Sequence, residues 1–92
     1  MATRAPRQAP VRSVYRTEQQ VIVDVLRSMR EGAGLTQVGL AEILGRTQSY
    51  VSGAERGSKL DALQIRDWCQ ACGTDLISWA KAVEAALSGK RK

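Results

Sequence analysis

The chain has 92 residues, enough for one small domain. Hydrophobic residues make up 43% and aromatic residues only 4%, with no Phe, so we expect a fold with an aliphatic core. No apolar run approaches the ~20 residues that cross a bilayer, and no signal peptide is recognisable. We therefore expect no membrane association and a cytoplasmic location.

Histidine is absent, which removes the commonest general base and the commonest zinc ligand. Two cysteines are too few for a secreted disulfide scaffold. We therefore expect that the protein is not an enzyme and that it holds no metal and no cofactor.

The net charge of +5 lies in the two ends of the chain. Residues 1–16 carry four arginines and no acid, residues 88–92 carry three basic residues, and residues 17–87 carry nine acids against seven bases. We divide the chain accordingly into a basic flexible or extended arm, a folded domain and a basic C-terminal tail. Basic tails suit an anionic partner such as nucleic acid, although they would also simply keep a protein soluble.

The first helix is expected to begin at Thr17, because Gln20 follows at the spacing of a capping box. Pro6 and Pro10 favour the arm before it, where a short strand is weakly indicated. The apolar face of this helix consists of Val21, Ile22, Val25, Leu26 and Met29. We expect it to end at Gly32, with that glycine in the left-handed conformation.

Two short helices are predicted next. Thr36 is positioned to cap one that ends at Gly45, and Thr47 to cap one that ends at Gly57. A glycine between two short helices is typical of a helix-turn-helix.

Two further helices complete the predicted fold. Asp61 with Gln64 forms a second possible capping box, and Asp75 is positioned to cap the last helix. Their apolar faces consist of Ile65, Trp68, Cys69 and Cys72, and of Leu76, Trp79, Ala80, Val83 and Leu87. The prediction is a compact all-α domain of five helices.

The stretch from Gln37 to Arg56 carries the most information. Ala41 is small where two helices must cross closely, and Gly45 tolerates the positive φ of a sharp turn. The residues in this region that form a recognisable pattern are Leu35-Thr36-Gln37, Leu40-Ala41, Leu44-Gly45, Thr47-Gln48-Ser49, Val51 and Glu55-Arg56-Gly57. This pattern resembles the signature of the lambda-repressor/Cro family, also called the XRE family, and the likeness extends from Arg30 to Gly73. It implies a lambda-repressor-like, DNA-binding fold.

The resemblance also implies particular roles. Gln37 would bind a phosphate and brace the recognition helix, and Gln48 would enter the major groove, where a glutamine amide can pair with adenine. The loop after the recognition helix would contact phosphates. Arg46 is more polar than the residue that many family members have in the turn, and we expect it to contact a phosphate from that position. The complete expected DNA-binding set is Gln37, Arg46, Thr47, Gln48, Ser49, Tyr50, Ser52, Gly53, Arg56, Ser58 and Lys59.

Arg30 and Glu55 match a salt-bridged pair of the family, and we expect this pair to support the fold. Gly39 and Gly53 depart from the family pattern, and each should cost ~1 kcal/mol relative to Ala inside a helix. Gly53 also removes a possible base-reading side chain.

Cys69 and Cys72 form a C-x-x-C motif. No βαβ pattern surrounds it, so we interpret both residues as small apolar core residues. A zinc site would need two more ligands from a second subunit.

We expect a transcriptional regulator, most simply a repressor, that binds double-stranded DNA sequence-specifically. We expect it to bind as a homodimer and to be associated with the nucleoid when it is bound to DNA. The basic arm would follow the minor groove or be disordered. Three alternatives stay open: an antitoxin that autoregulates its operon and binds a toxin partner, a protein-binding adaptor, and a thiol sensor that uses Cys69 and Cys72.

Overall fold

A computed structural model describes residues 4–90, with side chains for residues 18–89. This part of the chain contains no strand and forms five helices: α1 (Arg4–Gly32), α2 (Gln37–Leu44), α3 (Gln48–Glu55), α4 (Ala62–Ala71) and α5 (Leu76–Lys90). The predicted all-α fold of five helices is confirmed. Within the same residues, no helix has the length and apolar character needed to cross a bilayer.

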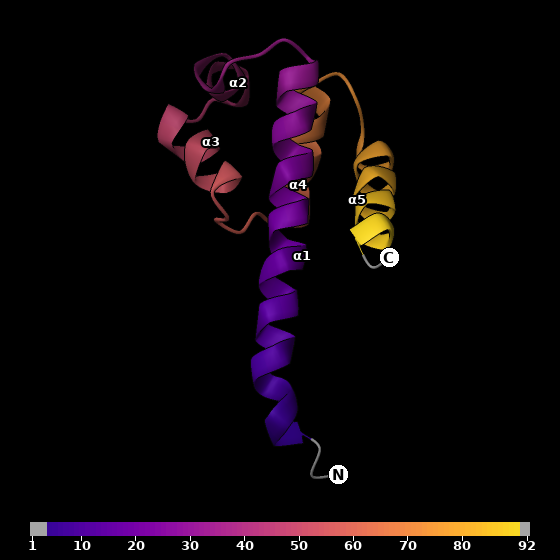
Figure 1. Ribbon diagram of the computed structural model, residues 1–92. Coiled ribbons are helices and arrows are strands. Elements are labelled where there is room, and N and C mark those ends of the chain that lie inside the picture. Colours follow the sequence, from indigo (N-terminus) through magenta and orange to yellow (C-terminus); the bar gives the residue numbers. More distant parts are fainter. Residues whose placement is uncertain (1–3, 91–92) are drawn as a thin grey trace.

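The first helix is much longer than expected. It runs without a break through 29 residues from Arg4, so the expected extended arm and short strand are wrong, and Thr17 lies inside the helix (Figure 1). Pro6 falls in the first turn, where no N–H partner is needed, and the neighbouring Arg4, Arg7 and Gln8 favour helix. Pro10 lies further inside the helix, where it cannot donate a backbone hydrogen bond. Residues 1–3 of the predicted arm lie outside the described part of the chain.

The C-terminal ends of α1 and α5 also differ from expectation. Gly32 is still helical, and Gly34 adopts the left-handed conformation instead, with φ of 75°. At the other end, α5 continues to Lys90, so most of the predicted basic tail is helical, while residues 91–92 are not described.

The main core lies where α1, α2, α3 and α4 meet. It is formed by Leu26, Leu40, Ala41, Val51, Ala54 and Trp68. Trp68 is fully buried, and its indole Nε1 donates a hydrogen bond to the Leu26 carbonyl at 3.1 Å. This bond joins α4 to α1 across 42 residues of sequence.

α5 packs on the side of α1 that faces away from α2 and α3 (Figure 1). Val83 is buried, and Trp79 is half-buried against the core. Ala80 was expected on the same face but is exposed. Ile77 is 67% exposed, so α5 presents an apolar residue to solvent.

Candidate nucleic-acid interface

Two threonine caps and one glycine set the geometry of α2 and α3. The Thr36 hydroxyl accepts a hydrogen bond from the Gly39 N–H at 2.9 Å, and the Thr47 hydroxyl accepts one from the Tyr50 N–H at 3.1 Å. Gly45, with φ of 69°, ends α2 in the left-handed conformation. The three predicted signals are confirmed, and they produce a turn of only three residues between the helices.

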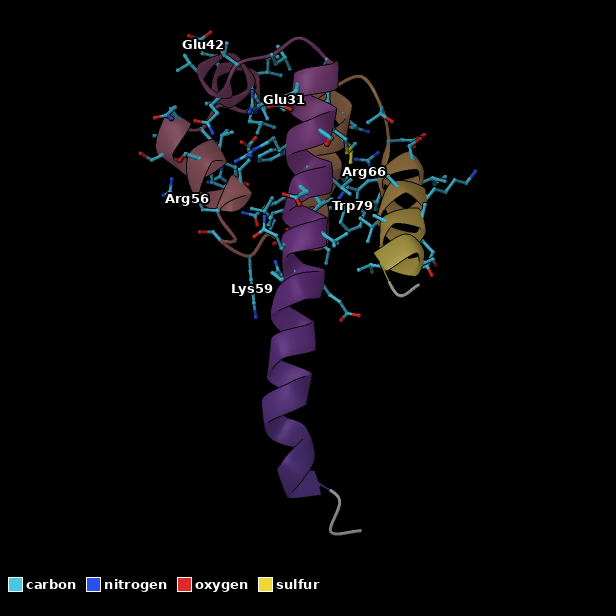
Figure 2. All side chains as sticks on the ribbon, viewed as in Figure 1. Glu31, Glu42, Arg56, Lys59, Arg66 and Trp79 are labelled. Atoms are coloured by element: carbon cyan, nitrogen blue, oxygen red, sulfur yellow. The ribbon has the colours of Figure 1, made fainter. Side chains whose placement is uncertain are left out.

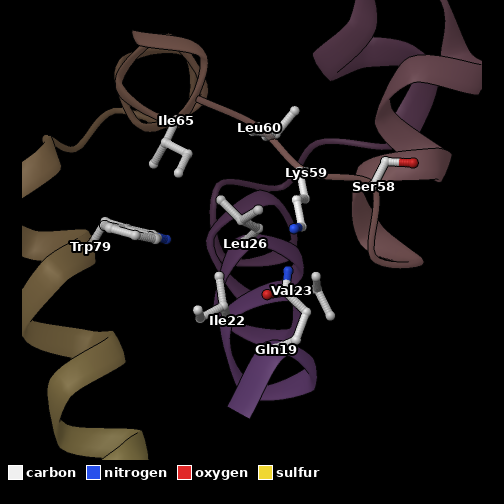
Figure 3. Close-up of a pocket in the computed structure, with 9 residues that line it drawn as sticks. All are labelled: Gln19, Ile22, Val23, Leu26, Ser58, Lys59, Leu60, Ile65 and Trp79. Carbon is white, nitrogen blue, oxygen red and sulfur yellow. The ribbon is translucent and has the colours of Figure 1, made fainter. Parts of the chain in front are cut away.

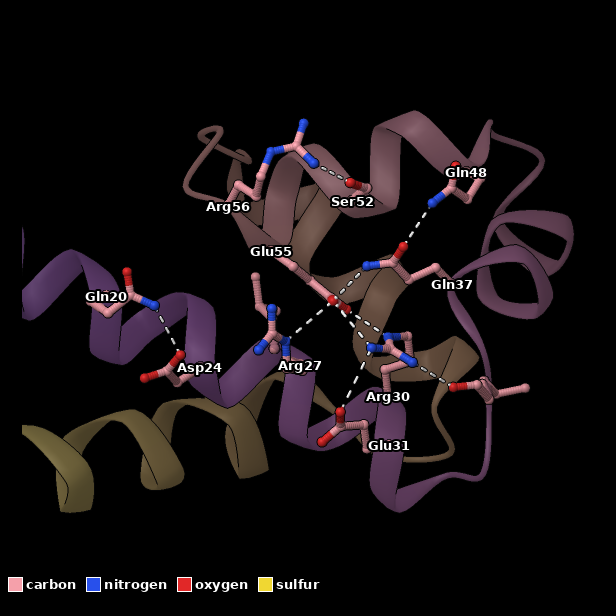
Figure 4. A network of polar contacts seen from close by, with 12 residues as sticks. Gln20, Asp24, Arg27, Arg30, Glu31, Gln37, Gln48, Ser52, Glu55 and Arg56 are labelled. Carbon is pink, nitrogen blue, oxygen red and sulfur yellow. Dashed lines mark hydrogen bonds and ion pairs between the residues drawn. The ribbon is translucent and has the colours of Figure 1, made fainter.

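A buried carboxylate holds these helices on α1. The Glu55 side chain, at the end of α3, is 1% exposed, and its oxygens accept hydrogen bonds from Arg30 Nε at 2.6 Å and Arg30 Nη2 at 3.2 Å (Figure 4). Arg30 Nη1 also donates to the Leu35 carbonyl at 2.8 Å, which fixes the chain before α2. The expected Arg30–Glu55 pair is therefore confirmed, and it stabilises the mutual position of three helices.

Burial is the largest single influence on the pKa of this carboxylate, but its hydrogen bonds and charge partner together outweigh it. Burial alone would raise the pKa of Glu55, but hydrogen bonds from Arg30 and Gln37 and the Arg30 charge hold that pKa below its ordinary value. The Glu55 hydrogen bond raises the pKa of Arg30 against the opposing effect of burial. Both groups are ionised at neutral pH, as a buried pair requires.

Gln37 connects this buried pair to the surface of α3. Its Nε2 donates to Glu55 Oε1 at 3.0 Å, and its Oε1 accepts a hydrogen bond from Gln48 Nε2 at 2.7 Å (Figure 4). Gln48 is exposed at the first position of α3. The chain of contacts from Arg30 through Glu55 and Gln37 orients the Gln48 amide before any ligand is present.

One arginine lies at each end of α3. The Arg46 guanidinium stacks over the Tyr50 ring, 4.7 Å from its centroid, and Arg56 donates to the Ser52 hydroxyl. Burial raises the pKa of Tyr50 although Arg46 acts in the opposite sense, so the phenol is neutral. Arg56 and Lys59 lie on the α3 side of α1, whereas Trp79 lies toward α5 (Figure 2).

The predicted site residues come from the start of α2, the turn, α3 and the loop after it. Of the eleven, Gln37, Tyr50, Ser52 and Gly53 are half-buried, and the others are exposed: Arg46, Thr47, Gln48, Ser49, Arg56, Ser58 and Lys59.

Among the predicted site residues, Gly53 faces the loop that follows α3. A Cβ on Gly53 would lie 3.3 Å from Ser58 Oγ, so this position faces the following loop. A Cβ on Gly39 would likewise lie 3.2 Å from the capping Oγ1 of Thr36. Both glycines therefore stand where the chain approaches itself closely.

The sequence analysis did not predict two further contacts of the Arg30–Glu55 pair. Arg27 Nε lies 3.5 Å from Glu55 Oε1, and the Leu35 carbonyl binds Arg30. Arg27 precedes Arg30 by three residues and so shares its helix face, a spacing that could have indicated the contact. The Leu35 carbonyl has no side-chain signal.

The C-x-x-C pair belongs to the core. Cys69 is fully buried, and burial raises the pKa of its thiol to about 11. Cys72 packs against the core at the end of α4, and burial raises the pKa of its thiol as well. The full burial of Cys69 confirms its interpretation as a core residue. The raised pKa of both thiols is the opposite of the lowered pKa typical of reactive cysteines, which weakens the thiol-sensor alternative.

A tight glycine turn between two short helices, with the start of the second helix exposed, defines a helix-turn-helix domain, a class of DNA-binding proteins. A family model described as a helix-turn-helix domain matches residues 22–77, more than half of the chain. The solved structure of an XRE-family like protein from Pseudomonas syringae pv. tomato str. DC3000 is 35% identical, with a TM-score of 0.74, and the match covers 83% of this chain and 94% of that one. The chain belongs to the XRE family of helix-turn-helix proteins.

Two more distant structures share the fold. The clp gene regulator ClgR from Corynebacterium glutamicum is 23% identical, with a TM-score of 0.72 and coverage of 80% of each chain. A mutant of the restriction-modification controller protein C.Esp1396I is 18% identical, with a TM-score of 0.72 and coverage of 76% of this chain and 95% of that one. No curated protein matches the chain.

Proposed function

We propose that this protein is a transcriptional repressor that binds double-stranded DNA sequence-specifically through α3. The observation that carries the proposal is the orientation of the exposed Gln48 amide by Gln37, which is itself bound to the buried Glu55. Recognition helices of this type present their N-terminal residues to base edges in the major groove. Occupancy of an operator would then exclude RNA polymerase, so the protein acts by binding and needs no chemistry of its own.

Gln48 is the proposed base-reading residue. One N–H of its amide is used by Gln37, which leaves the second N–H and the oxygen for a base. This is the donor and acceptor pair that matches adenine N7 and N6 in the major groove. Ser49 and Tyr50 follow on the next positions of α3 and would contact the neighbouring bases.

The phosphate contacts are proposed for the cations and hydroxyls that flank α3. Arg46 precedes the helix, and Arg56, Ser58 and Lys59 follow it, so basic groups lie at both of its ends. Cations spaced in this way would contact the backbones on the two sides of a groove. Binding should therefore weaken steeply as the salt concentration rises.

A homodimer is proposed because one recognition helix covers only a half-site. α5 lies on the opposite side of α1 from α3 (Figure 1) and carries the exposed Ile77, so a twofold interface through α5 would leave α3 free. Most oligomers are symmetric, and dimers are the commonest of them.

The test is selection of bound duplexes from a random pool with the wild-type protein, with Gln48→Ala and with Gln70→Ala. Gln70 is an exposed glutamine on α4, and so it is a matched control outside the proposed interface. We expect a palindromic site for the wild type and for Gln70→Ala, and a relaxed preference at one base pair in each half-site for Gln48→Ala. Failure to enrich any sequence would contradict the proposal and would favour a protein-binding adaptor.

A further inference from the structure

Arg27 of α1 contacts the same carboxylate oxygen as Gln37. Its Nε lies 3.5 Å from Glu55 Oε1, which also accepts the hydrogen bond from Gln37 Nε2 at 3.0 Å. Figure 4 shows the two side chains approaching Glu55 from different sides, Arg27 from α1 and Gln37 from α2. Arg27 is therefore joined, through one buried oxygen, to the start of α2, where the interface proposed above begins.

The charge of Arg27 is not needed to neutralise Glu55. Arg30 already binds this carboxylate through two nitrogens, at 2.6 Å and 3.2 Å, and its side chain is only 11% exposed. The exposed Glu31 carboxylate lies 3.9 Å from Arg30 Nη2, so it acts on Arg30 rather than on Arg27. Two guanidinium groups thus share one buried carboxylate, and the excess positive charge attracts a further anion.

Enough of the Arg27 guanidinium is accessible to bind that anion. The Arg27 side chain is 49% exposed, whereas that of Glu55 is 1% exposed. The contact to Glu55 uses Nε, and among residues 18–89 Arg27 has no other ion-pair partner. Both of its Nη groups can therefore donate to the oxygens of a phosphate, an arrangement that the planar guanidinium favours.

The face of α1 that carries Arg27 also meets the loop after α3. Val23, one turn before Arg27 on that face, lines a cavity together with Ser58 and Lys59 of the loop (Figure 3). The start of α2 and this loop both carry phosphate contacts proposed above. Arg27 is therefore connected to both segments, through Glu55 on one side and through the helix face on the other.

We propose that Arg27 binds a backbone phosphate of double-stranded DNA, so that the interface extends from α2 and α3 onto α1. This inference rests on the DNA binding proposed above but not on base reading by Gln48, because a phosphate contact carries no sequence information. The buried Glu55 would then orient two kinds of contact, the Gln48 amide through Gln37 and the Arg27 guanidinium directly.

The test is the salt dependence of binding to a duplex of random sequence, measured for the wild type, Arg27→Gln, Arg27→Lys and Arg66→Gln. Arg66 is an exposed arginine on α4 and serves as the matched control. Arg27→Gln should lower the slope of log affinity against log salt concentration by about 0.9 for each bound protomer. The other two variants should keep the wild-type slope, because one retains the charge and the other lies outside the interface. A purely structural role for Arg27 would change thermal stability but not this slope, and an unchanged slope for Arg27→Gln would overturn the proposal.

The contacted phosphate is located on the selected duplex by replacing each backbone phosphate in turn with a neutral methylphosphonate. We expect one position in each half-site where the replacement weakens binding of the wild type and leaves Arg27→Gln unaffected. Equal effects on both proteins at every position would overturn the proposal. If selection enriches no sequence but Arg27→Gln lowers the slope on the random duplex, base reading by α3 is wrong and the Arg27 contact is supported. If no duplex is bound at any salt concentration, both proposals are overturned.

Discussion

The side-chain amide of Gln37 lies between Glu55 and Gln48, donating to the Glu55 carboxylate at 3.0 Å and accepting from the Gln48 amide at 2.7 Å. One residue at the start of α2 therefore connects the buried ion pair at the end of α3 to the exposed glutamine at its beginning. This connection makes the stability of the domain and the geometry of the proposed DNA contact depend on the same few side chains, and that dependence can be tested.

Arg30→Ala should destabilise the domain by about 3 kcal/mol, because it leaves the Glu55 carboxylate, 1% exposed, with weaker partners and releases the Leu35 carbonyl. Urea denaturation followed by circular dichroism measures the change. Arg66→Ala, which removes an exposed arginine from α4, is the control and should stay within about 0.5 kcal/mol of the wild type. An unchanged midpoint for Arg30→Ala would show that the pair does not support the fold.

The free energy of unfolding should depend on Glu55 at acidic pH. The folded pKa of Glu55 is lowered, so its contribution is fully present above the ordinary glutamate pKa of about 4.3 and is lost as pH falls through the folded value. Urea denaturation between pH 7 and pH 2 should show this loss, and Glu55→Gln should show a smaller one. The backbone N–H and hydroxyl of Ser78 also lower the pKa of Asp75, so part of the slope should remain. Identical slopes for both proteins would contradict the assignment.

Gln37→Ala should reduce both stability and DNA affinity. It removes a hydrogen bond to a buried carboxylate, worth about 1.5–3 kcal/mol, and frees the Gln48 amide. Gln20→Ala is the control, because Gln20 makes only an exposed hydrogen bond to Asp24 at 2.9 Å. Denaturation and duplex titration of both variants check the prediction. It fails if Gln37→Ala loses stability but binds the selected duplex with wild-type affinity and base preference.

Gly53→Ala should show a stability effect that depends on Ser58. Alanine favours the helix by ~1 kcal/mol, but its Cβ would lie 3.3 Å from Ser58 Oγ, so the gain in the wild-type background should be smaller. In a Ser58→Ala background, where that oxygen is absent, the full gain should appear. A double-mutant cycle measures the difference. Equal effects in the two backgrounds would mean that the contact does not restrain the loop.

Local chemistry explains which parts of the fold could be predicted. Thr36, Thr47 and the pair of Asp61 and Gln64 all cap helices as expected, because each bond is made within three residues along the sequence. The Arg30–Glu55 pair came from the family resemblance, since nothing local joins residues 25 apart.

Other features could not be predicted from short motifs, because they depend on the neighbouring sequence or on contacts between residues far apart in the chain. Thr17 and Gln20 matched a capping box, but the arginine-rich stretch before them continues the helix to Arg4. The bond from Trp68 to the Leu26 carbonyl and the unpaired indole of Trp79 depend on how α1, α4 and α5 pack. The position of Gln48 on α3 was predictable from the sequence, whereas its hydrogen bond to Gln37 required the structure.

The central claim is that Gln48 reads an adenine in the major groove, and it is tested most directly by changing one atom of the DNA. Each adenine of the selected duplex is replaced in turn by 7-deazaadenine, which lacks the N7 acceptor, and the affinity is measured for the wild type and for Gln48→Ala. We predict one position in each half-site where the replacement weakens the wild type and leaves Gln48→Ala unaffected, with a coupling of about 1 kcal/mol or more. If every position affects both proteins equally, Gln48 does not read adenine and the proposed recognition is wrong.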